Sequence, residues 1–347
     1  MKTLRDFNFK NKRVLVRCDF NVPLSEKGEI LDDFRIKKTI PTIEYLIEKG
    51  AKLLLMSHLD DPGGKVVEEL RLTPIQDKLM EYLDLSVTRA PDCIGKEIEE
   101  WTKSMVPGEV LLLENLRFHK EEEENDAHFA QQLAKLGDIY INDAFGACHR
   151  AHASIVGIAK YLPSGMGPLL EKEIRVLTQL IANPLKPLVG IIGGKKVETK
   201  SKVIDKISQI ADWILINSLI KNEIEGKNIK LKYPQKIIKP VDDIEEKDIG
   251  PETINLFKEK IVQAKTIFWS GPLGKIEEEQ FQTGSAEIAQ VVIRSGAFSV
   301  VGGGETIEFI NKIGLIDKFS HVSTGGGAML DFISDGKLVG LEALSKK

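Results

Sequence analysis

The sequence predicts an α/β protein: two doubly wound parallel-sheet domains joined by a hinge helix. The chain has 347 residues, which is long for one hydrophobic core and typical of two domains. Short apolar runs rich in β-branched residues alternate with longer segments of helical period, as in successive βα units. A helical segment bounded by Pro168 and Pro184 separates two such series and is predicted to connect them.

The first series predicts one sheet with helices packed on it. Strands are expected near 13–18, 52–57, 110–114 and 138–142, and helical patterns lie between them at 36–48, 74–82 and 126–136. The charged stretch KEEEEND at 120–126 is expected to be an exposed face and a helix start.

The second series follows the connector and predicts another sheet, with strands near 188–192, 213–217, 237–241, 266–269 and 299–301. We therefore expect a first domain at 1–165, a hinge helix at 166–184 and a second domain at 185–331. The last residues, 332–347, are expected to return to the first domain.

Bulk composition limits the possible partners. A formal net charge of −4 gives no general attraction for nucleic acid or anionic membranes, so any basic site must be local. No apolar run reaches the ~18 to 20 residues of a membrane span, and the N-terminus lacks the apolar core of a signal peptide. We expect a cytoplasmic protein. Cys18, Cys93 and Cys148 have no CxxC spacing, so the sequence indicates neither a disulfide framework nor a zinc site.

Cations follow three of the predicted strands. The run at 139–154 carries His149, Arg150 and His152, the run at 110–119 carries Arg117 and His119, and the run at 13–23 carries Arg17, Asp19 and Asn21. Ligands of open parallel sheets bind outside the carboxyl ends of the strands. One arginine at a strand end is more often a solvated residue, but three such runs favour a small phosphate or carboxylate ligand.

Seven segments resemble phosphoglycerate kinase in order and spacing: RCDFNVPL, ENLRFH, NDAFGACHRAHAS, GGKKV, WSGPLG, VVGGGET and HVSTGGGA. The resemblance covers nearly the whole chain, and NDAFG followed by HRAHAS is a very specific motif. It implies reversible phosphoryl transfer between 1,3-bisphosphoglycerate and ADP, giving 3-phosphoglycerate and ATP, with Mg²⁺ and no covalent enzyme intermediate. It also implies a monomer with small-molecule substrates and no nucleic-acid or membrane partner.

By this resemblance the first half binds the acid substrate. The residues at the family's substrate positions are Arg17, Asp19, Phe20, Asn21, Arg35, His58, Arg117, His149 and Arg150. A planar guanidinium can hold a phosphate or a carboxylate with paired hydrogen bonds. Arg35 is the predicted catalytic arginine, because phosphoryl transfer depends on positioning and on stabilising charge. His149 and His152 either orient this basic patch or simply pack.

The second half resembles the family's nucleotide site. At 191–200 a strand, a glycine turn and a lysine-bearing helix start suit phosphate. Neither GxxxxGK[ST] nor GxGxxG is present, so a P-loop NTPase or a dinucleotide-binding dehydrogenase is poorly supported. The family's nucleotide positions fall on Gly193, Gly194, Lys196, Lys200, Ser270, Glu277, Gly303, Gly304, Glu305 and Thr306. Lys196 and Lys200 are also predicted to be catalytic, and Glu305 is expected to hold Mg²⁺ indirectly, through the nucleotide.

The chain departs from the family pattern in three places. The usual SHLGRP reads SHLDDP here, which puts Asp60 and Asp61 where the family has a glycine and an arginine. Glu305 replaces an aspartate. After Trp213 the family's triple glycine becomes Asn217, Ser218 and Leu219, and about one βα unit is missing. These departures leave open a weakened or inactive family member that only binds phosphoglycerate or nucleotide, or an acyl-phosphate kinase for another acid.

Overall fold

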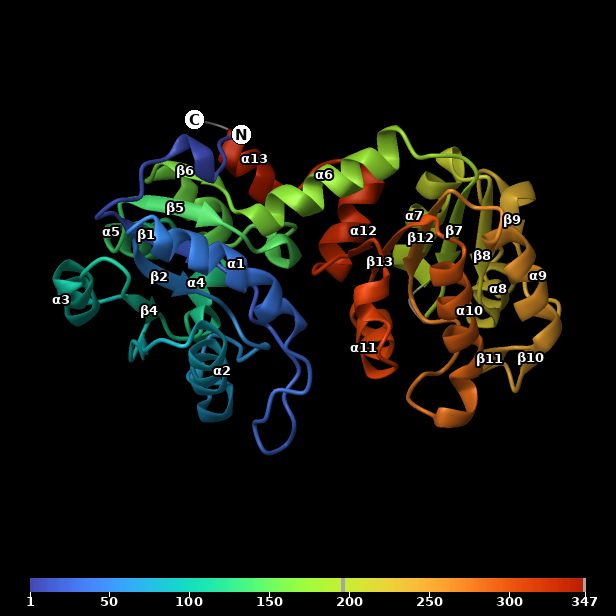
Figure 1. Ribbon diagram of the computed structural model, residues 1–347, viewed down its shortest axis with the longest axis horizontal. Helices are drawn as coiled ribbons and strands as arrows, with labels where there is room; N and C mark the ends of the chain where they lie inside the picture. The colour runs from blue at the N-terminus through green and yellow to red at the C-terminus, as the bar shows by residue number, and fades with distance from the viewer. Residues whose placement is uncertain (195–196, 346–347) are drawn as a thin grey trace. The chain divides into compact units, whose positions relative to one another are not determined.

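The computed structural model describes residues 1–194 and 197–345, which divide into two compact units. The first unit is Met1–Ile174 with the C-terminal Lys337–Lys347, and the second unit is Arg175–Gly336. Each unit contains a six-stranded, wholly parallel sheet (Figure 1). The predicted α/β class with two parallel sheets is confirmed.

The sheet of the first unit has the strand order β3-β4-β2-β1-β5-β6. Its strands are β1 (Arg13–Arg17), β2 (Lys52–Met56), β3 (Val87–Arg89), β4 (Val110–Leu112), β5 (Ile139–Asn142) and β6 (Ser164–Met166). Its helices are α1 (Phe34–Glu48), α2 (Thr73–Leu83), α3 (Lys96–Ser104), α4 (Lys120–Glu123), α5 (Ala127–Lys135) and α13 (Val339–Ser345).

Successive strand residues point to opposite faces of this sheet, and both sets of side chains are buried, so both faces of the sheet are covered. Val14 and Val16 of β1 belong to the core that α1 and α2 complete. Tyr140 of β5 is also fully buried, and its hydroxyl donates to the Ser154 carbonyl at 2.7 Å. The loop after β5 is therefore anchored against the sheet.

The sheet of the second unit has the strand order β14-β13-β12-β7-β8-β9, and a short antiparallel pair, β10-β11, lies apart from it. The strands are β7 (Leu188–Ile192), β8 (Trp213–Ile216), β9 (Ile237–Ile238), β10 (Asp243–Ile244), β11 (Asp248–Ile249), β12 (Thr266–Ser270), β13 (Phe298–Gly302) and β14 (His321–Val322). The helices are α7 (Val197–Ile210), α8 (Ser218–Gly226), α9 (Pro251–Ile261), α10 (Thr283–Arg294), α11 (Gly304–Lys312) and α12 (Gly326–Asp335).

Helices cover both faces of this second sheet as well. Ile191 and Trp269 lie in one core with residues of α9 and α10. On the other face Gly190 lies against Ile207 of α7, and Gly302 lies against Met329 of α12. The helices α7 and α12 therefore cover the same face of this sheet.

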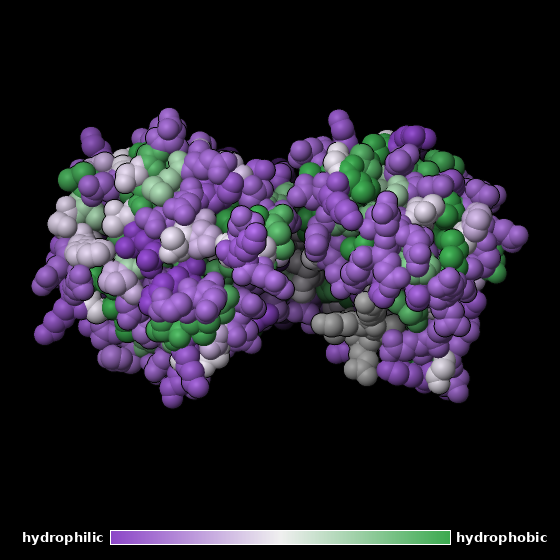
Figure 2. Space-filling view, turned by 90° about the horizontal axis from the view of Figure 1, so that it is seen from below, coloured by the Kyte–Doolittle hydropathy of each residue, from purple (hydrophilic) through white to green (hydrophobic). Residues whose placement is uncertain are grey.

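The long helix α6 (Pro168–Ala182) runs from the first unit into the second, since the boundary falls between Ile174 and Arg175. Among the described residues no helix combines the length and apolar character needed to cross a bilayer. Figure 2 shows one face of the molecule, on which most side chains are hydrophilic and apolar ones are scattered.

One local expectation needs correction, and one segment contains a helix that was not predicted. The strand expected at 237–241 is only Ile237–Ile238, because Pro240 follows soon after and has no N–H for a strand ladder. In the segment after Trp213 the chain turns directly into α8, and Asn217 caps that helix by accepting from the Ile220 N–H at 3.1 Å. The strands β3, β6 and β14 were too short, at two or three residues, for their pattern to be recognised in the sequence.

Candidate active site

Four arginines gather around His58 in the first unit. His58 follows β2, Arg17 ends β1, and Arg150 lies in the loop after β5, so all three stand at the carboxyl edge of the sheet. Arg17, Arg117, Arg35 and Arg150 are close enough to His58 to act on its charge. We call these four arginines and His58 the basic patch.

Arg17 forms the buried floor of the basic patch. Its side chain is inaccessible to solvent, Nε donates to Ser154 Oγ at 2.8 Å, and Nη1 donates to the Cys18 carbonyl. Nη2 lies 3.2 Å from His58 Nδ1 and 3.9 Å from Glu122 Oε1. Direct contact between Arg17 and a substrate, as expected from the sequence, is therefore not possible in this conformation, because its donors are already engaged inside the protein.

Glu122 corrects the expectation of an exposed charged face at 120–126. It is fully buried, and its carboxylate accepts from the Ser154 N–H at 2.8 Å and from Ser154 Oγ at 2.5 Å. His152 Nδ1 lies 3.8 Å from the same carboxylate. Burial raises the pKa of Glu122, while Arg17 opposes that rise. Glu122 thus fixes Arg17 and the 152–154 loop together.

Arg35 lies at the accessible rim of the basic patch, at the start of α1. Its Nη1 donates to the Asn21 carbonyl at 2.8 Å and to Asp19 Oδ1 at 3.3 Å. About 29% of the side chain is exposed, which leaves room for a ligand contact. Phe20, by contrast, is fully buried in the core, so its side chain is not available to a substrate.

Arg117 contacts the SHLDDP segment, in which this chain departs from the family pattern. Its Nη1 donates to the Asp60 carbonyl at 2.7 Å, and Asn21 Oδ1 accepts from the Asp60 N–H at 2.8 Å. Asp61 lies near enough to act on the charge of Arg117. The Nη2 atom of Arg117 is buried and has no hydrogen-bond partner among the described residues. An oxyanion would supply the acceptor that this donor lacks.

The pKa values of His58 and His152 are both lowered, which favours their neutral forms. Burial, followed by the charges of Arg17 and Arg117, lowers the pKa of His58 well below its usual value. The same causes lower the pKa of His152 to about 3. The positive charge therefore comes from the arginines. Arg150 is exposed and His149 half-buried, and Arg150 Nε lies 3.4 Å from His149 Nε2.

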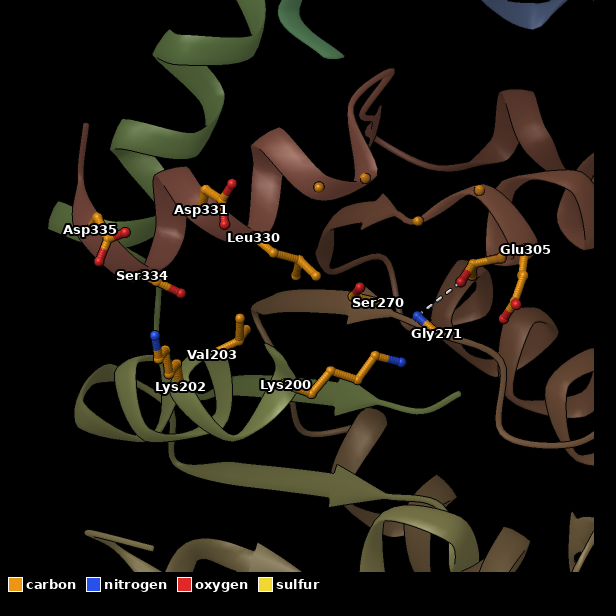
Figure 3. A pocket seen from close by; sticks show the side chains of 15 residues that line it. Lys200, Lys202, Val203, Ser270, Gly271, Glu305, Leu330, Asp331, Ser334 and Asp335 are labelled. Carbon is orange, nitrogen blue, oxygen red and sulfur yellow. Dashed lines mark hydrogen bonds between the residues drawn. The ribbon is translucent and has the colours of Figure 1, made fainter. Parts of the chain in front are cut away.

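A pocket of about 890 Å³ occupies the second unit (Figure 3). Its walls are the loops that follow β12 and β13 together with residues of α7 and α12, and the lining residues include Lys200, Lys202, Val203, Ser270, Gly271, Gly303, Gly304, Glu305, Thr306, Gly326, Gly327, Leu330 and Asp331. We call it the phosphate pocket. The sequence-predicted Lys200, Ser270, Gly303, Gly304, Glu305 and Thr306 all meet there.

Glycine backbones meet closely around the phosphate pocket. A Cβ built on Gly193 would lie 2.0 Å from the Pro272 carbonyl oxygen, and one on Gly326 would lie 3.1 Å from Gly303 Cα. Side chains would therefore force these loops apart. The helices α11 and α12 begin at these loops and direct free N–H groups toward the same space, which is a favourable arrangement for an anion.

Two charged side chains of this pocket, Lys200 and Glu305, lie near its glycine turn. A Cβ built on Gly194 would lie 2.5 Å from Lys200 Nζ and 3.8 Å from Glu305 Oε2. Lys200 Nζ donates to the Gly193 carbonyl, and the Gly271 N–H donates to Thr306 Oγ1 at 2.9 Å. Lys196 lies outside the described residues.

The pocket differs from the sequence prediction in two respects. The predicted Gly193, Gly194 and Glu277 are absent from the residues that line the pocket, and Glu277 is exposed. Lys202, Val203, Leu330 and Asp331 line it without having been predicted. In the sequence these four residues are distinguished only by their place in the first two turns of α7 and α12. That place identifies them as pocket residues only when the two helices are known to pack together.

The fold and the two sites define an α/β protein of two units, with a cluster of arginines at the edge of one parallel sheet and a glycine-lined pocket beside the other. The family model described as phosphoglycerate kinase matches residues 4–227 and 219–337. The chain belongs to the phosphoglycerate kinase family.

Relatives cover the chain from end to end. It is 42% identical to the phosphoglycerate kinase of Moorella thermoacetica, with 99% of each chain covered, and 42% identical to that of Borrelia garinii subsp. bavariensis, with 100% of each covered. The crystal structure of phosphoglycerate kinase from Pyrococcus horikoshii OT3 matches with a TM-score of 0.90 at 33% identity, covering 99% of this chain and 98% of that one. The Coxiella burnetii phosphoglycerate kinase structure matches with a TM-score of 0.82 at 31% identity, covering 99% of both.

The alignments also show that this chain is short. They run over 390 and 392 positions, whereas this chain has 347 residues, so both relatives carry residues that it lacks. The two ranges matched by the family model overlap at 219–227, which is most of α8. This is the segment in which the sequence analysis placed the missing unit.

Proposed function

We propose that this phosphoglycerate kinase holds its acid substrate on the basic patch of the first unit and its nucleotide in the phosphate pocket of the second unit. The single observation that carries the proposal is the set of four arginines around a neutral His58, with Arg117 Nη2 buried and unpaired among the described residues. A phosphate or carboxylate group satisfies that donor.

Some residues of the basic patch contact the substrate in this proposal, and others hold those residues in place. We propose that Arg35, Arg117 and Arg150 contact 3-phosphoglycerate or 1,3-bisphosphoglycerate, with Asp19 and Asn21 orienting Arg35. Arg17 supports the patch from below, held by Glu122 and Ser154. Arg35 lies at the accessible rim, where its charge stabilises the phosphoryl group during transfer.

The phosphate pocket suits ATP or ADP. The N–H groups that begin α11 and α12 offer hydrogen bonds to phosphate oxygens, and Lys200 adds a positive charge at the glycine turn. Glu305 supplies carboxylate oxygens, the ligand type Mg²⁺ prefers, near the same turn. Mg²⁺ bound with the nucleotide neutralises phosphate charge. We propose the same nucleotide role for Lys196 and Glu277, on the resemblance alone.

The remaining expectations also follow from the family. We propose that the kinase is a cytoplasmic monomer whose partners are its small-molecule substrates. The surplus of acidic residues supports the absence of a nucleic-acid partner.

A coupled assay of the purified full chain with ATP, Mg²⁺ and 3-phosphoglycerate tests the proposal. We expect turnover, a raised KM for 3-phosphoglycerate in Arg117→Ala, and lost turnover with retained acid binding in Lys200→Ala. Arg13→Ala is the matched control. Arg13 is an arginine that is ion-paired with Asp138, and it begins β1, whereas Arg17 of the basic patch ends this strand. Ligand binding without turnover in the unmodified chain would instead support a binding module.

A further inference from the structure

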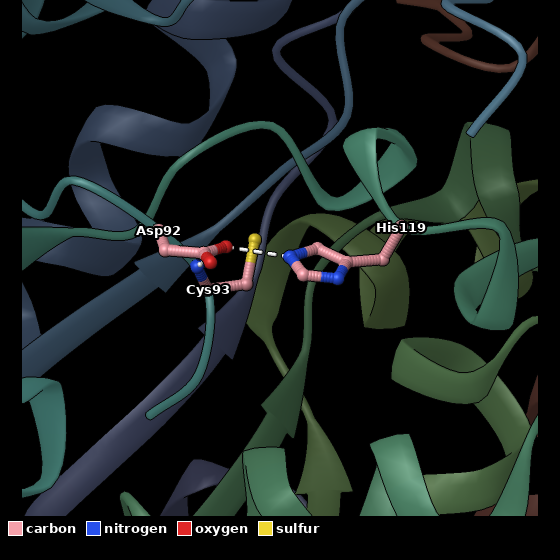
Figure 4. Close-up of side chains that lie close together, drawn as sticks. All are labelled: Asp92, Cys93 and His119. Atoms are coloured by element: carbon pink, nitrogen blue, oxygen red, sulfur yellow. Dashed lines mark hydrogen bonds and ion pairs between the residues drawn. The ribbon is translucent and has the colours of Figure 1, made fainter. Parts of the chain in front are cut away.

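Three metal-ligating side chains meet outside both sites already described. They are Asp92, Cys93 and His119, and one ligand atom of each lies within 4.8 Å of the other two (Figure 4). Neither the basic patch nor the phosphate pocket includes any of them. No motif spacing marks this cluster in the sequence, because the imidazole and the thiol come from different loops.

The topology of the first sheet explains this meeting. The strands β3 and β4 are parallel neighbours, so the loops that follow them leave the same edge of the sheet. Asp92 and Cys93 lie in the loop after β3, and His119 ends the turn Leu116–Phe118 after β4. Backbone hydrogen bonds join the two segments, because the Ala90 N–H donates to the Leu112 carbonyl at 2.8 Å and the Glu114 N–H donates to the Asp92 carbonyl at 3.5 Å.

The three groups already point at one another. His119 Nε2 lies 2.5 Å from Asp92 Oδ1, and the Cys93 N–H donates to that oxygen at 2.6 Å. Cys93 is buried and its Sγ lies 3.0 Å from the Glu114 carbonyl oxygen. The Phe129 ring, 5.0 Å from the His119 ring between centroids, limits how that imidazole can turn.

The surrounding charge favours a cation. The carboxylates of Glu121 and Glu122 act on His119 in addition to Asp92 itself. Arg71 acts on Asp92 and Arg17 acts on Cys93, but Arg71 is paired with Glu68 and Glu114, and Arg17 Nη2 lies 3.9 Å from Glu122. Among the groups that act on the three ligands, carboxylates therefore outnumber arginines.

We propose that Asp92, Cys93 and His119 form a binding site for one divalent cation of the zinc type. Thiolate, imidazole and carboxylate together are the ligands of Zn²⁺ and Co²⁺, whereas Mg²⁺ demands oxygen ligands. The Asp92 side chain is 49% exposed, which gives the ion an entry path and leaves a fourth position for water. Binding releases the thiol proton of Cys93 and any proton held between His119 and Asp92.

Such an ion would tie the loop after β3 to the loop after β4. His119 is two residues from Arg117, so the site borders the basic patch without sharing a residue with it. The ion would raise the thermal stability of the chain, because it binds only the folded arrangement.

Cobalt tests the proposal directly. The full chain, stripped of metal with a chelator and dialysed, is titrated with CoCl₂ and followed by absorption. We expect one equivalent to produce a near-ultraviolet thiolate-to-cobalt band that ZnCl₂ then removes. The band should vanish in Cys93→Ser and persist in Cys148→Ser, the matched control, because Cys148 is an equally buried free thiol in another loop.

A second variant keeps the test valid if Cys93→Ser folds poorly. Asp92→Asn changes a half-exposed side chain, and we expect it to weaken Co²⁺ binding by roughly tenfold or more while circular dichroism stays unchanged. Absence of the band in the unmodified chain, an equal band in Cys93→Ser, or equal affinity in Asp92→Asn would overturn the proposal.

Discussion

At the scale of single residues, Arg35 combines accessibility with fixed geometry. Its guanidinium is held by the Asn21 carbonyl and Asp19, yet part of it faces solvent. We predict that Arg35→Ala lowers kcat by on the order of 10²-fold or more while nucleotide affinity stays the same, because a donor that stabilises transferring charge is lost. Steady-state kinetics and nucleotide titration measure both. Lys38→Ala, an exposed cation on the same helix, should leave kcat unchanged, and an active Arg35→Ala enzyme would exclude Arg35 from the chemistry.

Asp61 acts against anion binding. It is exposed, and its charge reaches Arg117 in the basic patch. We predict that Asp61→Asn lowers KM for 3-phosphoglycerate by about two- to fivefold at low salt, and that the gain shrinks at high salt because exposed charges are screened. Asp77→Asn, an exposed aspartate on α2, is the control. An unchanged KM in Asp61→Asn at low salt would show that the loop keeps this carboxylate away from the substrate.

The role of a residue could be predicted where a sequence motif indicates it, and could not be predicted where the role depends on burial. Arg17, Arg117 and Arg150 were predicted because they follow strands, whose carboxyl ends meet at one edge, whereas Arg35 and His58 were assigned from the family resemblance. The burial of Glu122 was missed, since a run of four glutamates does not reveal which one turns inward. Its partners, the N–H and hydroxyl of Ser154, come from a loop about thirty residues later.

At the scale of elements, the connecting helix α6 begins on a buried carboxylate. Asp143 Oδ1 accepts from the Leu169 and Leu170 N–H groups at 2.9 and 3.1 Å, and Oδ2 accepts from Thr42 Oγ1 at 2.5 Å. Burial raises the pKa of Asp143 to about 6, against 3.8 for an ordinary aspartate. Asp143 thus joins β5, α1 and the start of α6 through one titrating group.

The raised pKa has a predictable effect on stability. The folded state binds this proton more tightly than the unfolded state, so the contribution of Asp143 to the free energy of unfolding falls as the pH rises from 3.8 to about 6. We predict that Asp143→Asn, which keeps an oxygen acceptor but cannot titrate, removes this dependence, on the order of 3 kcal/mol over the window. Urea unfolding of both proteins across that range measures it. Parallel curves for the two proteins would contradict the prediction, and Asp77→Asn should leave the curve unaltered.

The helix α8 stands where the family has a glycine turn that borders the adenine pocket. Neither Trp213 nor Leu219 lines the phosphate pocket, and Trp213 packs against the core on the α9 side, with Lys260 over its ring at 5.1 Å. Nucleotide affinity should then come mainly from the phosphates and ribose. We predict that the enzyme discriminates poorly between ATP and GTP. Measured kcat/KM values decide this, and an ATP preference above roughly 100-fold, about 2.7 kcal/mol, would mean that new residues have rebuilt a base pocket.

Elements were predictable in proportion to their length. The strand at 188–192 and the helices α1, α2, α5 and α6 were predicted to within two residues, because their apolar period extends over enough positions. The β10-β11 pair was missed because each strand has two residues and its pairing depends on a tight turn. The helix α8 was not predicted for another reason: the segment after Trp213 was compared only with the family's triple glycine, and the capping role of Asn217 was not recognised.

At the scale of the whole molecule, the proposed acid site and the proposed nucleotide site belong to different units. The basic patch belongs to the first unit and the phosphate pocket to the second, and α6 passes from one unit to the other. Direct phosphoryl transfer without a covalent intermediate requires the two ligands to meet while water is excluded. We therefore predict that the two ligands are brought together during turnover, with the connecting helix α6 acting as the hinge.

We predict that the radius of gyration falls only when both ligands are bound. Small-angle scattering of the full chain with 3-phosphoglycerate alone, with Mg²⁺ and a non-hydrolysable ATP analogue alone, and with all three measures it. Each ligand alone fills one site and gives no contact across to the other, so it should leave the radius nearly unchanged, whereas both together stabilise the closed arrangement. Arg117→Ala is the control, because weak acid binding should abolish compaction at ligand concentrations that compact the unmodified chain. A constant radius with both sites saturated would contradict closure and would require the units to be already apposed in the free protein.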